Sequence, residues 1–185
     1  MSPLIQRTLQ KTALTLISAV LFVGFFKFND WIFHTLEHSK GVNWVFLPAG
    51  FRVILVLVLG LPGALGLMLG SWFIDWEVID GSNPLLGLLN GVAGGLTPWV
   101  VMKYLHKHHW LSEQLQKLDP LQLLNLTLIS SAASAVAHQL VWLLMDRPNI
   151  NVWVDVWPMF FGNVTGALLM LYSFKFALDR LRIKT

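Results

Sequence analysis

Residues Phe46–Gly70 read FLPAGFRVILVLVLGLPGALGLMLG and contain a single charged residue, Arg52. As one helix the stretch would extend roughly 37 Å, at about 1.5 Å per residue. The sequence Gly60-Leu61-Pro62-Gly63 favours a break, because proline interrupts a helix and glycine adopts turn conformations. We therefore expect two short apolar helices joined by a tight turn. Such a hairpin cannot bury its own surface in water, so the stretch predicts a membrane environment.

The composition of the whole chain also indicates a membrane protein. Of its 185 residues, 55% are hydrophobic and 12% are charged. A soluble domain carries about 25% charged residues. The chain has no cysteine, which excludes disulfides and Cys-ligated metal sites. The net charge of +3 does not indicate a nucleic-acid partner, because in a membrane protein the positions of the charges matter more than their sum.

The apolar runs predict an all-α fold, a polytopic membrane bundle of six transmembrane helices forming one domain over residues 1–185. The first run begins like a signal peptide, after Arg7 and Lys11, but no small-x-small cleavage site follows it. We therefore expect it to stay as an uncleaved span. The expected spans cover about residues 12–33, 42–60, 61–76, 85–104, 120–145 and 153–178.

The distribution of basic residues predicts the orientation of these spans. An even number of spans leaves both termini on one side, and most of the Lys and Arg residues outside the spans fall on that side. The opposite side has only Lys40 and Arg147. The positive-inside rule therefore predicts cytoplasmic termini and a multi-pass protein of the inner membrane. The basic residues on the terminal side are Arg7, Lys11, Lys103, Lys107, Lys117, Lys175, Arg180, Arg182 and Lys184.

Arg52 is the most informative residue for function. A charge within a span costs roughly 2.5–3.5 kcal/mol on insertion scales, so it normally faces the bundle and finds a partner. Asp30, Asp75 and Asp155 are expected at a comparable depth. Three interpretations follow: a structural ion pair with one of these carboxylates, an anchor for an anion beneath an outer vestibule, or a side chain that reaches the outer headgroups.

A second group of polar residues lies in the later spans. His138 follows Ser130 and Ser134 at intervals of four, so the three share one helical face. Together with Asn163 they predict either a hydrogen-bonded interior or a small polar pocket. We expect His138 to be a buried, hydrogen-bonded histidine, with haem ligation or a proton relay as the alternative.

The sequence does not indicate an enzyme or a cofactor site. His34 and His38 have the spacing of two metal-binding imidazoles on a helix, but the HExxH signature is absent. The sequence also lacks a P-loop, a GxSxG elbow and a glycine-rich dinucleotide turn. We therefore expect a non-enzymatic protein with no metal and no cofactor.

Two sets of glycines predict helix packing. Residues spaced by four on a helix form one face, and a face of glycines allows another backbone to approach closely. The partner surface can belong to this chain or to another protein. The glycines are Gly87, Gly91 and Gly95 in the fourth expected span, and Gly162 and Gly166 in the sixth.

Part of the chain resembles a known family. The run Leu47-Pro48-Ala49-Gly50, the later Gly60-Leu61-Pro62-Gly63 with Leu69-Gly70, and the segment Gly162-Asn163-Val164-Thr165-Gly166 are similar to MASE1-type bacterial membrane sensory domains. The resemblance implies a helical bundle that senses a signal or engages partners in the bacterial inner membrane. The size of the bundle is also similar to substrate-binding subunits of bacterial vitamin transporters.

Three functions are therefore expected in turn. The first is a non-enzymatic, MASE1-like sensory or partner-binding protein of the inner membrane. It would contact the lipid bilayer and a membrane or cytoplasmic protein, with a possible small-molecule ligand near Arg52. The second is a transporter or substrate-capture subunit, which requires a solvent-reachable cavity near Arg52, His138 and Asn163. The third is an accessory subunit of a membrane redox complex.

Overall fold

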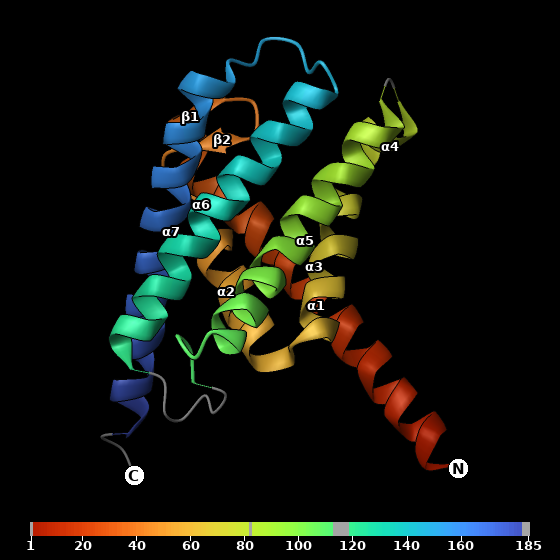
Figure 1. Ribbon diagram of the computed structural model, residues 1–185, viewed down its shortest axis with the longest axis vertical. Coiled ribbons are helices and arrows are strands. Elements are labelled where there is room, and N and C mark those ends of the chain that lie inside the picture. The colour runs from red at the N-terminus through yellow and green to blue at the C-terminus, as the bar shows by residue number, and fades with distance from the viewer. Residues whose placement is uncertain (1, 82, 113–118, 183–185) are drawn as a thin grey trace.

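The computed structural model describes residues 2–81, 83–112 and 119–182, and the expected Lys117 and Lys184 lie outside them. The chain forms a helical bundle with one small β-hairpin (Figure 1), which confirms the predicted all-α class. The helices are α1 (Pro3–Phe33), α2 (Pro48–Leu59), α3 (Leu61–Ile74), α4 (Trp76–Asp80), α5 (Pro84–Lys107), α6 (Pro120–Leu144) and α7 (Val152–Arg182), and a short 3-10 helix covers His34–Leu36. The antiparallel hairpin pairs β1 (Glu37–Ser39) with β2 (Val42–Asn43).

Several helices begin with the same local signal, a proline at the first helical position. Proline is favoured there because its ring presets the helical φ and its missing N–H would have had no helical partner. In α5 the side chain of Asn83 accepts the N–H of Leu86 at 3.1 Å, and in α6 Asp119 and Gln122 form a capping box. The prolines are Pro3, Pro48, Pro84 and Pro120.

Within the described residues, four helices are long and apolar enough to cross a membrane: α1, α5, α6 and α7. They correspond to four of the expected spans, so the prediction of a helical membrane protein is confirmed at this level. Helices α2 and α3 have 12 and 14 residues. At about 1.5 Å per residue they extend roughly 18 and 21 Å, which is less than the roughly 30 Å of a bilayer core.

The predicted break between α2 and α3 falls at Gly60, which has φ 62° and ψ −132°. Only glycine adopts this conformation without strain. The other end of α2 differs from the expected span 42–60. Val42–Asn43 pairs as β2, and the helix begins only at Pro48. Because the N–H of Leu47 donates to Asn29 Oδ1 at 2.9 Å and that of Phe46 donates to the Gly162 carbonyl at 3.0 Å, these residues are held outside the helix.

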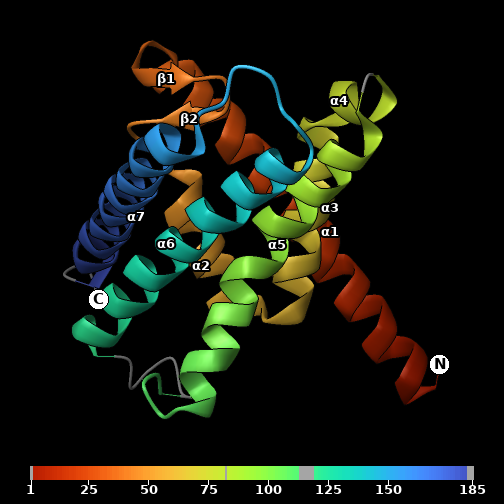
Figure 2. The same ribbon diagram turned by 45° about the horizontal axis from the view of Figure 1, so that its top comes forward.

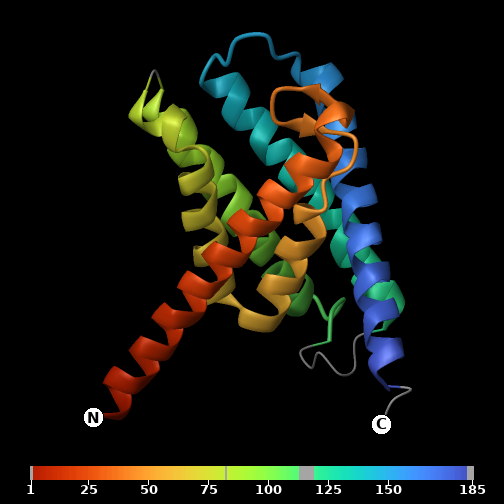
Figure 3. The same ribbon diagram turned by 180° about the vertical axis from the view of Figure 1, so that it is seen from behind.

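Helix α2 lies in the centre of the bundle (Figures 1 and 3). It contacts α1, α3, α5, α6 and α7, and every residue from Pro48 to Val53 is buried. The stretch with the strongest apolar character therefore forms the core that the longer helices surround. In contrast, the first half of α1 diverges from the bundle (Figure 3) and exposes apolar side chains such as Leu9 and Leu16.

The two termini lie at the same end of the molecule (Figures 1 and 3). The hairpin, α4 and the connection between α6 and α7 lie at the opposite end (Figures 1 and 2). The basic residues that the sequence assigns to the terminal side include Arg7 and Lys107, and those assigned to the opposite side are Lys40 and Arg147. The fold therefore separates these groups along its long axis.

The glycines of α5 lie against α3 and α4. Gly87 contacts Ile79, Gly91 contacts the indole of Trp72, and a Cβ on Gly95 would lie 2.6 Å from the backbone nitrogen of Met68. These surfaces are therefore occupied within the chain.

The glycines of α7 contact a segment that is not helical. A Cβ on Gly162 would collide with the Asn43 carbonyl, and one on Gly166 with the Phe46 carbonyl. These two glycines bring α7 close to the segment that connects β2 to α2, a contact that the helix-packing prediction did not include.

Candidate ligand-binding cavity

A cavity of about 740 Å³ lies at the end of the bundle that carries the hairpin. Its lining comes from α1, α2, α3, α4, α5, α6 and α7, from the hairpin and from the α6–α7 connection. At the rim, Lys40 and Asn149 are exposed, whereas Arg52 and Asn163 at the floor are buried. Because the lining extends from exposed to buried residues, a solute can reach the floor from the molecular surface.

Arg52 lies at the floor, with only 8% of its surface exposed. Its guanidinium carbon lies 5.0 Å from the centre of the Phe22 ring and 5.2 Å from that of Phe46. Within the described part of the chain no carboxylate forms an ion pair with Arg52, and its Nε has no hydrogen-bond partner. The structural ion pair that the sequence suggested is therefore not formed with Asp30 or Asp155.

Asp30 and Asp155 lie in different surroundings. Asp30 lines the cavity. Asp155 lies at the first turn of α7, where it accepts the N–H of Asn151 at 2.8 Å and contacts His38 Nε2 at 3.2 Å. It also accepts the Ser39 hydroxyl at 3.4 Å. Asp155 therefore caps α7 and fastens β1 to it, instead of facing Arg52.

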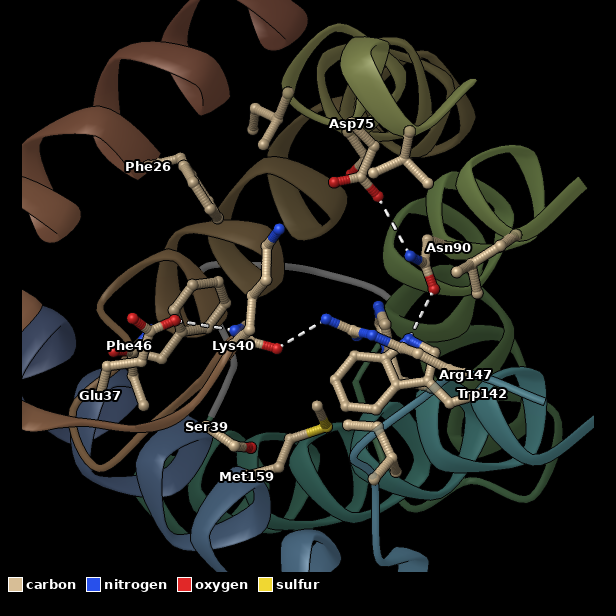
Figure 4. A pocket seen from close by; sticks show the side chains of 18 of the residues that line it. Phe26, Glu37, Ser39, Lys40, Phe46, Asp75, Asn90, Trp142, Arg147 and Met159 are labelled. Carbon is tan, nitrogen blue, oxygen red and sulfur yellow. Dashed lines mark hydrogen bonds between the residues drawn. The ribbon is translucent and has the colours of Figure 1, made fainter. Parts of the chain in front are cut away.

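One wall of the cavity contains a chain of hydrogen bonds from α3 to α6 (Figure 4). The Trp142 indole N–H donates to Asn90 Oδ1 at 2.9 Å, and Asn90 Nδ2 donates to Asp75 Oδ2 at 3.1 Å. Asp75 lies just after the last residue of α3. Burial raises the pKa of its carboxyl, and the hydrogen bond from Asn90 acts in the opposite direction. These bonds fix the positions of the Asn90 amide and the Asp75 carboxyl.

At the rim, Arg147 connects the α6–α7 connection to the hairpin. Its Nη2 donates to the Lys40 carbonyl at 2.7 Å, and its guanidinium carbon lies 4.0 Å from the centre of the Trp142 ring. Figure 4 shows this bond crossing the cavity beside Trp142. The two segments are far apart in sequence, so this contact helps to fix the shape of the opening.

His138 and Asn163 also line the cavity. His138 Nδ1 lies 2.8 Å from the Ser134 carbonyl, which can only accept, so this nitrogen carries the proton. Asn163 Nδ2 donates to the Ser131 carbonyl at 3.4 Å. In residues 2–81, 83–112 and 119–182, no three His, Cys, Asp or Glu side chains are grouped as they would be to hold a metal ion.

The structure therefore brings Arg52, Asp30, His138 and Asn163 to one cavity and leaves Asp155 at a separate contact. Sequence reasoning did not place Lys40 and Arg147 in the site. A signal for them was present, because they are the two basic residues assigned to the side that is otherwise acidic. Both line the cavity.

The charges in the cavity can hold a solute without chemical reaction. Arg52 supplies a positive charge at the floor, and Asp75 a carboxyl on the wall. Leaving a buried polar donor without a partner costs about 1–3 kcal/mol, and more for a charged group. A solute that accepts from Arg52 would remove this cost. Comparison of the chain with protein-family models, with curated proteins and with solved structures finds no match.

Proposed function

We propose that this protein is a non-enzymatic integral membrane protein that captures a small solute in the cavity centred on Arg52. The observation that carries the proposal is the buried guanidinium of Arg52, which faces a surface-reachable cavity and has no carboxylate partner among the described residues. Such a charge is costly in a membrane protein and commonly marks a substrate pathway or ligand site.

Solute capture is common to two of the functions expected from the sequence. A substrate-capture subunit would pass the solute to a transporter, and a sensory protein of MASE1-like type would respond to its binding. The size of the cavity favours capture, since ligand sites typically enclose about 300–1,000 Å³. The MASE1-type resemblance and a protein partner stay predictions.

We also infer six passes through the inner membrane, with both termini in the cytoplasm. Helices α1, α5, α6 and α7 supply four passes, and α2 and α3 supply the other two. A short helix serves for a pass when the surrounding helices and connecting segments cover its ends. The burial of α2 among five helices supports this arrangement, as does the shared end of the termini.

The proposal is tested by measuring solute binding to the purified protein in lipid nanodiscs. A library of small solutes is screened for an increase in melting temperature, and each positive is confirmed by calorimetry. We expect Arg52→Gln to lose the response. The matched control is Lys103→Gln, which removes an exposed charge at the opposite end of α5. Binding that is unchanged in Arg52→Gln, or a library without any positive, would contradict the proposal.

A further inference from the structure

The floor of the cavity has a second unpartnered donor beside Arg52. Ser71 of α3 is 8% exposed, and its hydroxyl has no hydrogen-bond partner within the described chain. The two side chains face a common point next to Gly94. A Cβ built on Gly94 would lie 3.2 Å from Ser71 Oγ and 3.4 Å from Arg52 Nη2. The missing side chain of Gly94 leaves this point open.

A guanidinium and a hydroxyl that face one point can both donate to an acceptor placed there. A negatively charged oxygen group is the strongest acceptor for such a pair, because charge-assisted hydrogen bonds are about twice as strong as neutral ones. The rings of Phe22 and Phe46 lie beside the guanidinium and lower the local dielectric. The floor is therefore suited to a carboxylate.

The wall of the same cavity presents the opposite charge. Asp75 does not form an ion pair with Arg52, and the hydrogen bonds through Asn90 to Trp142 hold its carboxyl in place. Asp30 and Glu37 add further carboxyls to the lining. A solute with two negative charges would be repelled by these groups, whereas one with separated charges of both signs satisfies the floor and the wall together.

We propose that the cavity binds a small zwitterion, with its carboxylate on Arg52 and Ser71 beside Gly94 and its cationic group at Asp75. This inference rests on the proposed solute capture and names the chemical class of the solute. The apolar part of the ligand would lie against Phe26, Leu86 and Met159, which line the remaining wall.

The test uses sets of probes with one carbon skeleton and different charges. One set is leucine, 4-methylpentanoate, leucinamide and 4-methylpentanamide, and equivalent sets are built on the skeletons of glycine, phenylalanine and lysine. Binding to the protein in nanodiscs is measured by calorimetry at neutral pH. We expect a zwitterion to bind most tightly, and its analogue without the ammonium to bind at least tenfold more weakly.

Four variants assign the contacts. Arg52→Gln and Gly94→Ala should abolish binding of the zwitterion, since the first removes the charge and the second fills the point beside it. Ser71→Ala should weaken binding about tenfold. Asp75→Asn should remove the preference for the zwitterion over the plain carboxylate. Lys103→Gln and Asp80→Asn remove exposed charges outside the cavity and should change nothing.

The outcomes separate this inference from the proposed function. If an anion, a cation or a neutral probe binds most tightly, or if Gly94→Ala and Ser71→Ala bind the zwitterion as well as the parent does, the zwitterion site is wrong and solute capture stands. If no probe of any charge class binds, both proposals are wrong. Because Gly94→Ala keeps every charge, it remains informative even where Arg52→Gln fails to fold.

Discussion

Arg52 combines a high cost of burial with weak compensation. Contacts with the faces of Phe22 and Phe46 supply part of the stabilisation that a counter-ion would give. Cation–π contacts contribute about 0.5–2 kcal/mol each. A residue retained under these conditions is better explained by binding than by stability, since functional sites often reduce the stability of the fold.

This interpretation predicts how the empty protein responds to Arg52→Met. Replacing one member of a buried ion pair costs about 3–5 kcal/mol, because the other charge is left alone. Arg52 has no such partner within the described residues, so we expect the free energy of unfolding to change by less than about 1 kcal/mol or to rise. Denaturant unfolding in detergent measures this change, with Lys103→Met as the control. A loss of several kcal/mol would show that Arg52 has a structural role.

Gly60 provides a second test at the scale of a residue. Its φ of 62° is unfavourable for any side chain, while a Cβ there would meet no atom within 4 Å. The effect of Gly60→Ala is therefore conformational, and we expect a loss of about 1–3 kcal/mol in stability. Gly24→Ala is the control, since Gly24 also has open space around it but lies within α1. That control should be neutral or stabilising by roughly 0.5–1 kcal/mol, and equal effects of the two substitutions would refute the explanation.

At the scale of elements, the hairpin and the segment before α2 depend on α7. The Phe46 N–H donates to the Gly162 carbonyl, Asp155 holds His38, and Gly162 lies directly against Asn43. Through these contacts α7 positions both the rim of the cavity and the first turn of α2, which carries Arg52 one turn later.

We therefore expect Gly162→Ala to disturb this whole region. The added methyl would collide with the Asn43 carbonyl, so the hairpin must move away from α7, at a cost of about 1–3 kcal/mol. Thermal unfolding compares this variant with Gly24→Ala, which adds a methyl in open space. Hydrogen exchange should rise in residues 37–47 of the variant. Unchanged stability and exchange would mean that the contact does not hold the hairpin.

At the scale of the whole molecule, the fold places the termini at one end and the hairpin, α4 and the α6–α7 connection at the other (Figure 1). This arrangement agrees with an even number of passes. The absence of native cysteine makes the topology directly measurable, because each introduced cysteine is the only one in the chain.

Single cysteines at exposed positions test the six-pass proposal. We expect Glu77→Cys and Asn151→Cys to react with a membrane-impermeant maleimide in intact cells, and Thr8→Cys and Lys107→Cys to react only after permeabilisation. Ala64→Cys is the control for burial, since Ala64 is 0% exposed. Reaction of Thr8→Cys and Glu77→Cys from the same face of the membrane would exclude this topology.

The sequence by itself determined the helices and the break between α2 and α3. Both depend on properties of neighbouring residues: the apolar runs, the prolines at helix starts and the conformation available at Gly60. The sequence also identified Arg52, His138 and Asn163 as unusual polar residues in apolar surroundings. Hydropathy and backbone stereochemistry are local, so they can be read without knowing the fold.

Only the tertiary structure decided which side chains meet. It left Arg52 without a carboxylate, gave Asp155 to His38, and placed Lys40 and Arg147 at the rim of the cavity. The contacts that shape this cavity join residues 52 positions apart, as for Asn90 and Trp142, or 107 apart, as for Lys40 and Arg147. Such pairs have no periodic pattern in a single sequence, because they depend on how the helices pack around α2.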